Sequence, residues 1–152
     1  MIYTLISESF ETFVDDQALI TAAEAVFALQ GIDPQAEVTI VVEDDEHLRQ
    51  LNQQFLGIDE PTDVLSFPAD EIDPDSGMRY LGDIILSYPR AQEQAAAAGE
   101  TVGEEMQMLV VHGMLHLLGF DHAGAEEKDA MWAAQQQALD RIGCKIRRLP
   151  EE

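Results

Sequence analysis

Cysteine is almost absent from this chain of 152 residues, which has only Cys144. A lone cysteine excludes an internal disulfide and is typical of a protein from a reducing compartment. The first residues, MIYTLISESFETF, contain no basic side chain and no sustained apolar run, so we expect no export signal. Nowhere does the sequence approach the run of roughly 20 apolar residues that a membrane helix needs. These absences predict a cytoplasmic protein with no membrane partner.

Basic side chains are also scarce: 8 Lys and Arg stand against 30 Asp and Glu, for a net charge of −22. Since proteins bind phosphate backbones largely through Lys and Arg, most of this surface should repel nucleic acid. The basic residues before position 128 are Arg49, Arg79 and Arg90, and those from 128 onward are Lys128, Arg141, Lys145, Arg147 and Arg148. The C-terminal cluster is either a solvated helix end favoured by the helix dipole or a local anion-binding patch.

The pattern of apolar residues predicts a single α/β (α+β) domain over residues 1–152. Apolar residues make up 46% of the chain, enough for a buried core. Alternation with a period of two predicts strands at 2–6 and 38–42, and the segments 64–67 and 80–87 are expected to be two more strands. Helical spacing predicts helices at 16–30, 45–55, 90–98, 106–118 and 126–142, and turn-forming residues predict an exposed loop at 70–77. We therefore expect a small mixed sheet of about four strands packed with about five helices.

A long central helix is predicted around the apolar stretch 106–118. Thr101 and Glu104 form a Thr-x-x-Glu capping box ahead of this stretch. Gly119 should end the helix, because glycine readily adopts the left-handed turn in which many helices terminate. The residues best suited to chemistry gather at this second end of the helix.

Three of the four histidines lie there within eleven residues: His112, His116 and His122. Residues i and i+4 of a helix lie on one face, about 5–6 Å apart at Cβ, so the first two imidazoles can bind one ion. A left-handed turn at Gly119 would return the third to the same point. Three neutral nitrogens with an open fourth position are typical of a catalytic zinc site rather than a structural one. We predict one Zn²⁺ per chain, or another divalent transition metal, over the interpretation of ordinary core or surface histidines.

This spacing equals that of the zinc proteases with the sequence His-Glu-x-x-His-x-x-Gly-x-x-His, with one difference. Their general base is the glutamate after the first histidine, and here that position holds Gly113. Peptide hydrolysis by that route lacks its proton acceptor. Asp121 lies inside the motif and is our candidate acceptor, so the predicted catalytic residues are Asp121 and the metal ligand His112. For an RNA substrate the alternative route is attack by its own 2′-hydroxyl.

Three blocks of sequence follow one another along the chain: Pro-Thr-Asp-Val-Leu-Ser-Phe-Pro at 61–68, Leu-Gly-Asp-Ile at 81–84 and His-Gly-Met-Leu-His-Leu-Leu-Gly-Phe-Asp-His at 112–122. Together they resemble the signature of the YbeY family of metal-dependent endoribonucleases. The resemblance implies a metal, usually zinc, on the three motif histidines. It implies a single-strand-specific endoribonuclease that matures the 3′ end of 16S rRNA and supports ribosome quality control. The implied partners are single-stranded rRNA, the small ribosomal subunit, and ribosomal proteins or assembly GTPases.

Residues suited to RNA contact are few. Many members of the family carry an arginine shortly before the Pro-Thr-Asp block, where this chain has Leu56. The candidate substrate-binding residues are Ser66, Arg147 and Arg148. If the two arginines only stabilise a helix end, the phosphate contacts fall to the three earlier arginines or to a ribosomal partner that presents the RNA. Asp83, inside an apolar strand, needs a partner and is either structural or catalytic.

Two rival functions stay open. A non-catalytic, metal-stabilised ribosome-assembly factor is favoured by the acidity and by Leu56, whereas the open metal position favours catalysis. A metalloprotease-like hydrolase comes third, because Gly113 occupies the position of its general base.

Overall fold

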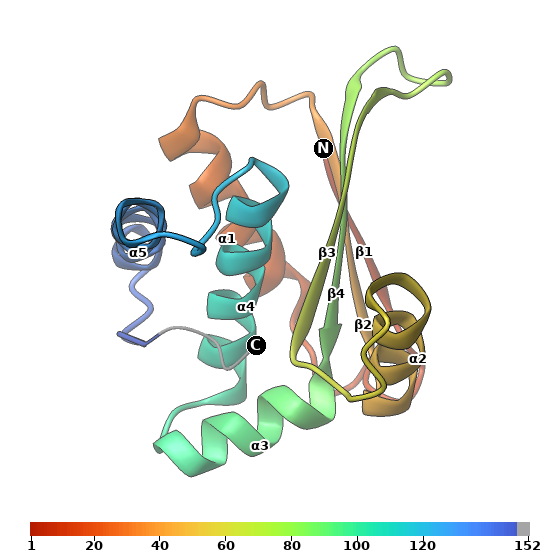
Figure 1. Ribbon diagram of the computed structural model, residues 1–152, viewed down its shortest axis with the longest axis vertical. Helices are drawn as coiled ribbons and strands as arrows, with labels where there is room; N and C mark the ends of the chain where they lie inside the picture. Colours follow the sequence, from red (N-terminus) through yellow and green to blue (C-terminus); the bar gives the residue numbers. More distant parts are fainter. Residues whose placement is uncertain (149–152) are drawn as a thin grey trace.

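Strands within residues 1–148, which are the residues that the computed structural model describes, form a four-stranded sheet in the order β1-β2-β4-β3 (Figure 1). They are β1 (Ile2–Ile6), β2 (Glu37–Glu43), β3 (Val64–Ile72) and β4 (Arg79–Ser87). β1 and β2 are parallel, as are β2 and β4, whereas β3 runs antiparallel to β4. The prediction of a small mixed sheet is confirmed.

Within the same residues the helices are α1 (Asp16–Gln30), α2 (Asp45–Leu56), α3 (Tyr88–Ala98), α4 (Val102–Leu117) and α5 (Ala125–Arg141). The predicted helices are confirmed, and α1 has the predicted bounds. Thr101 caps the start of α4 as predicted, since its Oγ1 accepts a hydrogen bond of 3.1 Å from the Glu104 N–H. None of the helices in the described residues combines the length and the apolarity that crossing a membrane requires.

The hairpin of β3 and β4 is longer than predicted, so the expected loop at 70–77 is wrong at its start. Backbone pairing continues to Ile72, opposite Arg79, and the turn is confined to residues 73–78. This end of the hairpin extends beyond the helices in Figure 1, and its β3 residues are exposed. An exposed hairpin accepts polar, turn-forming residues, so composition did not distinguish it from a loop.

Helices cover both faces of the sheet, as Figure 1 shows: α2 lies on one side, and α1, α4 and α5 lie on the other. Ile40 and Ile84 belong to the main core, on the side of α1 and α4. Leu65 and Ile85 point the other way and pack with Leu48 of α2 in a smaller cluster. Helix α4 is therefore enclosed between the sheet and α5, and its side chains are mostly buried.

Helix α4 approaches the sheet closely at Gly113. The Ser66 hydroxyl of β3 donates a hydrogen bond of 3.0 Å to the Gly113 carbonyl. A Cβ atom on Gly113 would lie 2.8 Å from Cγ2 of Ile84, closer than side chains normally pack. Any larger residue at position 113 would therefore force the Ile84 side chain to shift, so packing favours glycine here. The contact also fixes the rotation of α4 and so the direction of its histidines.

Candidate metal centre

The last turns of α4 and the segment after it bring three imidazoles together. One ring nitrogen of each of His112, His116 and His122 lies within 4.8 Å of the other two. Gly119, with φ of 96°, ends the helix: its N–H donates to the His116 carbonyl at 3.1 Å. The next N–H donates at 3.0 Å to the carbonyl five residues earlier, which completes a Schellman motif. The structure thus brings together the histidines that the spacing selected.

The donor atoms have a separation that fits a transition-metal ion. Nε2 of His112 lies 3.1 Å from Nε2 of His116. Two nitrogens bound at about 2.0–2.1 Å to a tetrahedral zinc lie about 3.3 Å apart, so this pair is close to the geometry of a ligand pair. Imidazole nitrogens suit zinc and other divalent transition metals. The three histidines can therefore hold one metal ion.

Gln135 of α5 contacts His112, and sequence reasoning missed this residue. This glutamine is fully buried, and its Oε1 lies 3.0 Å from His112 Nδ1. An amide oxygen only accepts hydrogen bonds, so the imidazole proton must be on Nδ1 and the Nε2 lone pair is left for a metal. Gln135 stands in a run of three glutamines, and nothing in its spacing distinguishes it from its neighbours.

A pocket of about 680 Å³ lies beside the histidines. Its wall includes His116, Asp121 and His122, while His112 lies behind them with 1% of its surface exposed. The rest of the wall comes from α2, α3, the start of β3 and the segment before it: Asn52, Leu56, Ile58, Glu60, Pro61, Thr62, Asp63, Val64, Leu65, Arg90 and Gln94. The volume is in the range of ligand-binding sites, so a bound ion would face a space that can hold a substrate.

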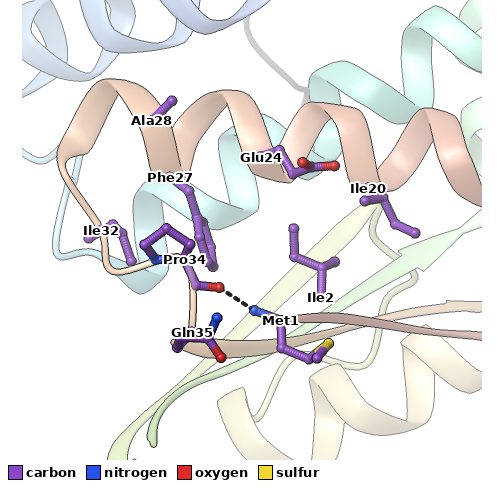
Figure 2. Close-up of a pocket in the computed structure, with 9 residues that line it drawn as sticks. All are labelled: Met1, Ile2, Ile20, Glu24, Phe27, Ala28, Ile32, Pro34 and Gln35. Carbon is purple, nitrogen blue, oxygen red and sulfur yellow. Dashed lines mark hydrogen bonds between the residues drawn. The ribbon is translucent and has the colours of Figure 1, made fainter.

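A second pocket, of about 500 Å³, lies between α1 and the start of β1 (Figure 2). Apolar side chains such as Ile2, Ile20 and Phe27 form much of its wall, and Figure 2 shows Glu24 and Gln35 on different sides of it. None of the predicted site residues lines this pocket. We therefore assign the candidate site to the pocket beside the histidines.

Asp121 is exposed on the wall of the histidine pocket. Its Oδ1 accepts a hydrogen bond of 2.7 Å from the backbone N–H of His122. The carboxylate therefore helps to hold the turn that carries the third histidine. Its role as proton acceptor stays a prediction.

Two of the predicted substrate-binding residues, Ser66 and Arg147, bind other parts of the protein. Ser66 uses its hydroxyl to bind the Gly113 carbonyl. Arg147 forms an ion pair of 2.6 Å with Asp140 on the surface. Neither residue lines the histidine pocket. Their contact with substrate stays a prediction.

The third predicted substrate residue, Arg148, is the counterion of a buried carboxylate. Glu105 of α4 is 0% exposed and forms an ion pair with Arg148, whose guanidinium also lies 3.0 Å from Glu100. Burial raises the pKa of Glu105 to about 6, although the Arg148 charge opposes the change. Since a buried charge requires a partner, this ion pair gives Arg148 a structural task. Its contact with RNA stays a prediction.

Arg90 is the basic residue that lines the histidine pocket. Its guanidinium forms an ion pair of 3.1 Å with Asp45 at the start of α2. Arg49 and Arg79 form surface ion pairs elsewhere. Of the three arginines that precede residue 128, Arg90 is therefore the one placed to meet a ligand of this pocket.

Asp83 and His47 have positions outside the candidate site. Asp83 accepts a hydrogen bond from the hydroxyl of Tyr80. Burial and this carboxylate raise the pKa of Tyr80 to about 12. The hydrogen bond supports the structural interpretation of Asp83. His47 is exposed on α2, as expected.

The fold and the site define a class of protein, namely a small α/β domain in which three histidines beside a pocket can together hold a metal ion. The family model described as Endoribonuclease YbeY matches residues 6–143. The chain therefore belongs to the endoribonuclease YbeY family, as the three sequence blocks implied.

Individual relatives agree with this assignment. The chain is 40% identical over 134 residues to Endoribonuclease YbeY of Mycolicibacterium smegmatis, and the aligned region covers 84% of this chain and 75% of the relative. It is 39% identical over 134 residues to Endoribonuclease YbeY of Mycobacterium tuberculosis, with 84% and 76% covered. The solution structure of TM1509 from Thermotoga maritima matches with a TM-score of 0.59 and 26% identity, over 94% of this chain and 92% of that one.

Proposed function

We propose that this protein is a metal-dependent endoribonuclease that cleaves single-stranded RNA and uses zinc. One observation carries the proposal: ring nitrogens of His112, His116 and His122 lie within 4.8 Å of one another beside a pocket of about 680 Å³. The names of the relatives support RNA as the substrate and an internal phosphodiester bond as the site of cleavage.

The bound ion would supply Lewis-acid polarisation of a phosphoryl oxygen and a lowered pKa for a coordinated water. The chain supplies the ligands and their orientation. His112 is buried and presents Nε2 because Gln135 accepts the proton of its Nδ1. His116 and His122 also line the pocket, so their side of the centre is open to substrate.

Asp121 is the proposed proton acceptor. It lies on the same wall as His116 and His122, and the three are close in sequence as well. Its carboxylate would accept a proton either from an attacking water or from the 2′-hydroxyl of the RNA. Either route places Asp121 beside the reacting phosphate, with its orientation set by the hydrogen bond to the His122 N–H.

The pocket wall favours an unpaired strand. Leu56 and Ile58 are exposed apolar side chains that line it, and an apolar surface can pack against base faces, which are accessible in an unpaired strand but stacked in a duplex. Arg90 is the proposed phosphate contact. The arginine pairs with a partly exposed carboxylate, Asp45, which a phosphate can replace.

In the cell, the proposed substrate is 16S rRNA near its 3′ end, with a role in ribosome quality control. The family name, endoribonuclease, supports an RNA substrate and is consistent with this more specific assignment. The proposed partners are the small ribosomal subunit with ribosomal proteins or assembly GTPases. A net charge of −22 makes basic ribosomal proteins suitable partners, since they would present RNA to a surface that otherwise repels it.

The same charge favours the second candidate, a metal-stabilised assembly factor that leaves RNA uncut. A metalloprotease is disfavoured by the structure. Gly113 takes the position of the protease base, and a side chain there would contact Ile84 of the sheet instead of entering the pocket.

The deciding experiment measures cleavage of single-stranded RNA, duplex RNA and casein, each with and without a chelator. We expect cleavage of the single strand alone, its loss with chelator and its return with zinc. His116→Ala should be inactive, while His47→Ala, which changes the exposed histidine of α2, should be as active as wild type. Intact RNA in the presence of metal-loaded protein would favour the assembly factor, and cleaved casein would favour the protease.

A further inference from the structure

A chain of hydrogen bonds connects the C-terminal segment, defined as residues 144–148, to His112. His112 Nδ1 lies 3.0 Å from Gln135 Oε1. The other end of this amide, Nε2 of Gln135, donates to the backbone carbonyl of Arg148 at 3.3 Å. Gln135 is 0% exposed, so water does not compete for either contact.

The carbonyl of Arg148 determines which way the amide points. A glutamine amide can be turned end for end, and its two orientations differ only in their hydrogen bonds. A backbone carbonyl only accepts, so the NH₂ of Gln135 must face Arg148 and the oxygen must face His112. The oxygen in turn places the imidazole proton on Nδ1, so that Nε2, which faces His116, carries the lone pair that can bind an ion.

Side chains of the C-terminal segment hold that carbonyl against α4. Cys144 and Ile146 are both 2% exposed and belong to the main core. Arg148 forms its ion pair with Glu105, which lies two turns before His112 on the same helix. The segment is therefore attached to the helix that carries the first ligand.

We infer that Gln135 is a positioning residue of the metal centre and that the C-terminal segment, through the carbonyl of Arg148, holds Gln135 in the orientation that suits metal binding. The inference rests on the metal site of the proposed function. It extends that site to two parts of the chain outside the histidine motif. Changes to such outer partners of a ligand typically weaken metal binding 10–100-fold.

Two variants of Gln135 distinguish positioning from packing. Gln135→Met keeps the length and apolar bulk of the side chain but removes the acceptor, so zinc affinity should fall about 10-fold or more. Gln135→Glu keeps an acceptor for the Nδ1 proton, so zinc affinity should be retained or increased. Competition with a chromophoric chelator measures both affinities. A role in packing alone predicts the opposite order, because methionine fits an apolar site better than a carboxylate.

A second pair of variants tests the C-terminal segment. Arg148→Gln removes the ion pair with Glu105 and should weaken zinc binding, while Lys145→Gln makes the same charge change at an exposed side chain of the segment and should not. Equal zinc affinity for folded Arg148→Gln and wild type would overturn the part of the inference that concerns the segment. If Arg148→Gln does not fold, the two Gln135 variants still decide the role of Gln135.

The tautomer of His112 is a readout that needs neither metal nor RNA. In the metal-free wild type, nitrogen chemical shifts should show the imidazole proton of His112 on Nδ1. In metal-free Gln135→Met they should show a mixture of the two neutral tautomers, with the proton on Nδ1 in some molecules and on Nε2 in others. Equal His112 nitrogen shifts in wild type and Gln135→Met would overturn the inference even if the protein cleaves RNA. A wild-type protein that binds no zinc but shows the Nδ1 tautomer would overturn the proposed function and leave the positioning by Gln135 in place.

Discussion

Gly113 shows how one residue separates two functions that share a spacing of histidines. In the zinc proteases with this spacing the corresponding residue is the catalytic glutamate. Here the residue faces the sheet: its carbonyl accepts a hydrogen bond from Ser66, and a Cβ would lie 2.8 Å from Ile84. A glutamate would enter the contact between α4 and β4. The close contact between α4 and the sheet therefore leaves no room for the glutamate that serves as the protease base. The same contact fixes the rotation of α4 and so the direction of its histidines.

Gly113→Ala should lower the free energy of unfolding by about 1–3 kcal/mol, the usual cost of overpacking a core. Gly103→Ala is the matched control, because it lies on the same helix with no atom within 4 Å of its Cβ position. That control should be neutral or stabilising by up to about 1 kcal/mol, through helix propensity. Urea unfolding measures both. Equal stability of Gly113→Ala and wild type would contradict the packing argument.

Glu105 should make stability depend on pH. Its pKa is about 6 in the fold and 4.5 when unperturbed, so its contribution to stability is full below about pH 4.5 and is lost as the pH rises through 6. A change of 1.5 pKa units corresponds to about 2 kcal/mol. Glu105→Gln removes this dependence. Between about pH 4 and pH 7, wild type should therefore lose about 2 kcal/mol relative to the variant. Parallel stability curves in urea would show that Glu105 does not titrate in this range.

At the scale of elements, local signals predicted most of the fold. Helix α1 had the predicted bounds because its start and end are marked in sequence: Asp15 caps the first turn, and Gly31 adopts the left-handed conformation with φ of 65°. The end of β3 was missed because its pairing with β4 depends on a partner strand rather than on its own composition. Helix ends are local events, whereas strand ends are decided by the neighbouring strand.

The residues of the candidate site also fall into two groups, those that local sequence signals predicted and those that depend on packing between helices. The histidines could be predicted because one helix and one turn, both marked by sequence signals, bring them together. Gln135 and Arg90 could not, since their places depend on how α5 and α3 pack around α4. The ion pair of Arg148 with Glu105 was missed for the same reason. A charged residue at the end of a chain gives no sign that its partner is buried 43 positions earlier.

Bound metal should stabilise the end of α4, but the helix should fold without the metal. Zinc at about 100 times its dissociation constant adds about 2.7 kcal/mol of stability, or roughly 5–10 °C in melting temperature for a domain of this size. Chelation should reverse that change and leave helix content intact, because α4 is packed by buried residues such as Leu109 and Met114. Thermal melts followed by circular dichroism test both statements.

Metal content gives the companion measurement. Wild type and His47→Ala should hold close to one equivalent of zinc or a similar metal, and His116→Ala should hold far less. Full metal content in His116→Ala would show that the three-histidine centre is not where the ion binds.

At the scale of the whole molecule, the main tension is between charge and substrate. A protein with a net charge of −22 is proposed to bind a polyanion. The described arginines offer little free positive charge for the RNA. All of them except Arg141 form an ion pair with a carboxylate, namely Arg49, Arg79, Arg90, Arg147 and Arg148. The proposed RNA binding must therefore rely on the proposed metal centre, on base contacts and on few phosphate contacts. Such binding depends only weakly on salt.

A salt series identifies which arginine contacts the phosphates. On single-stranded RNA each contact contributes about 0.7 to the slope of log affinity against log salt, so a wild type with one such contact should have a shallow slope. Arg90→Gln should weaken RNA binding and reduce the slope by about 0.7, with normal zinc content. Asp45→Asn should strengthen binding, because it removes the carboxylate that competes with phosphate for Arg90. Arg79→Gln, on the exposed hairpin, is the control and should change nothing. A reduced slope in Arg147→Gln with none in Arg90→Gln would move the RNA contact from the pocket to the C-terminal cluster.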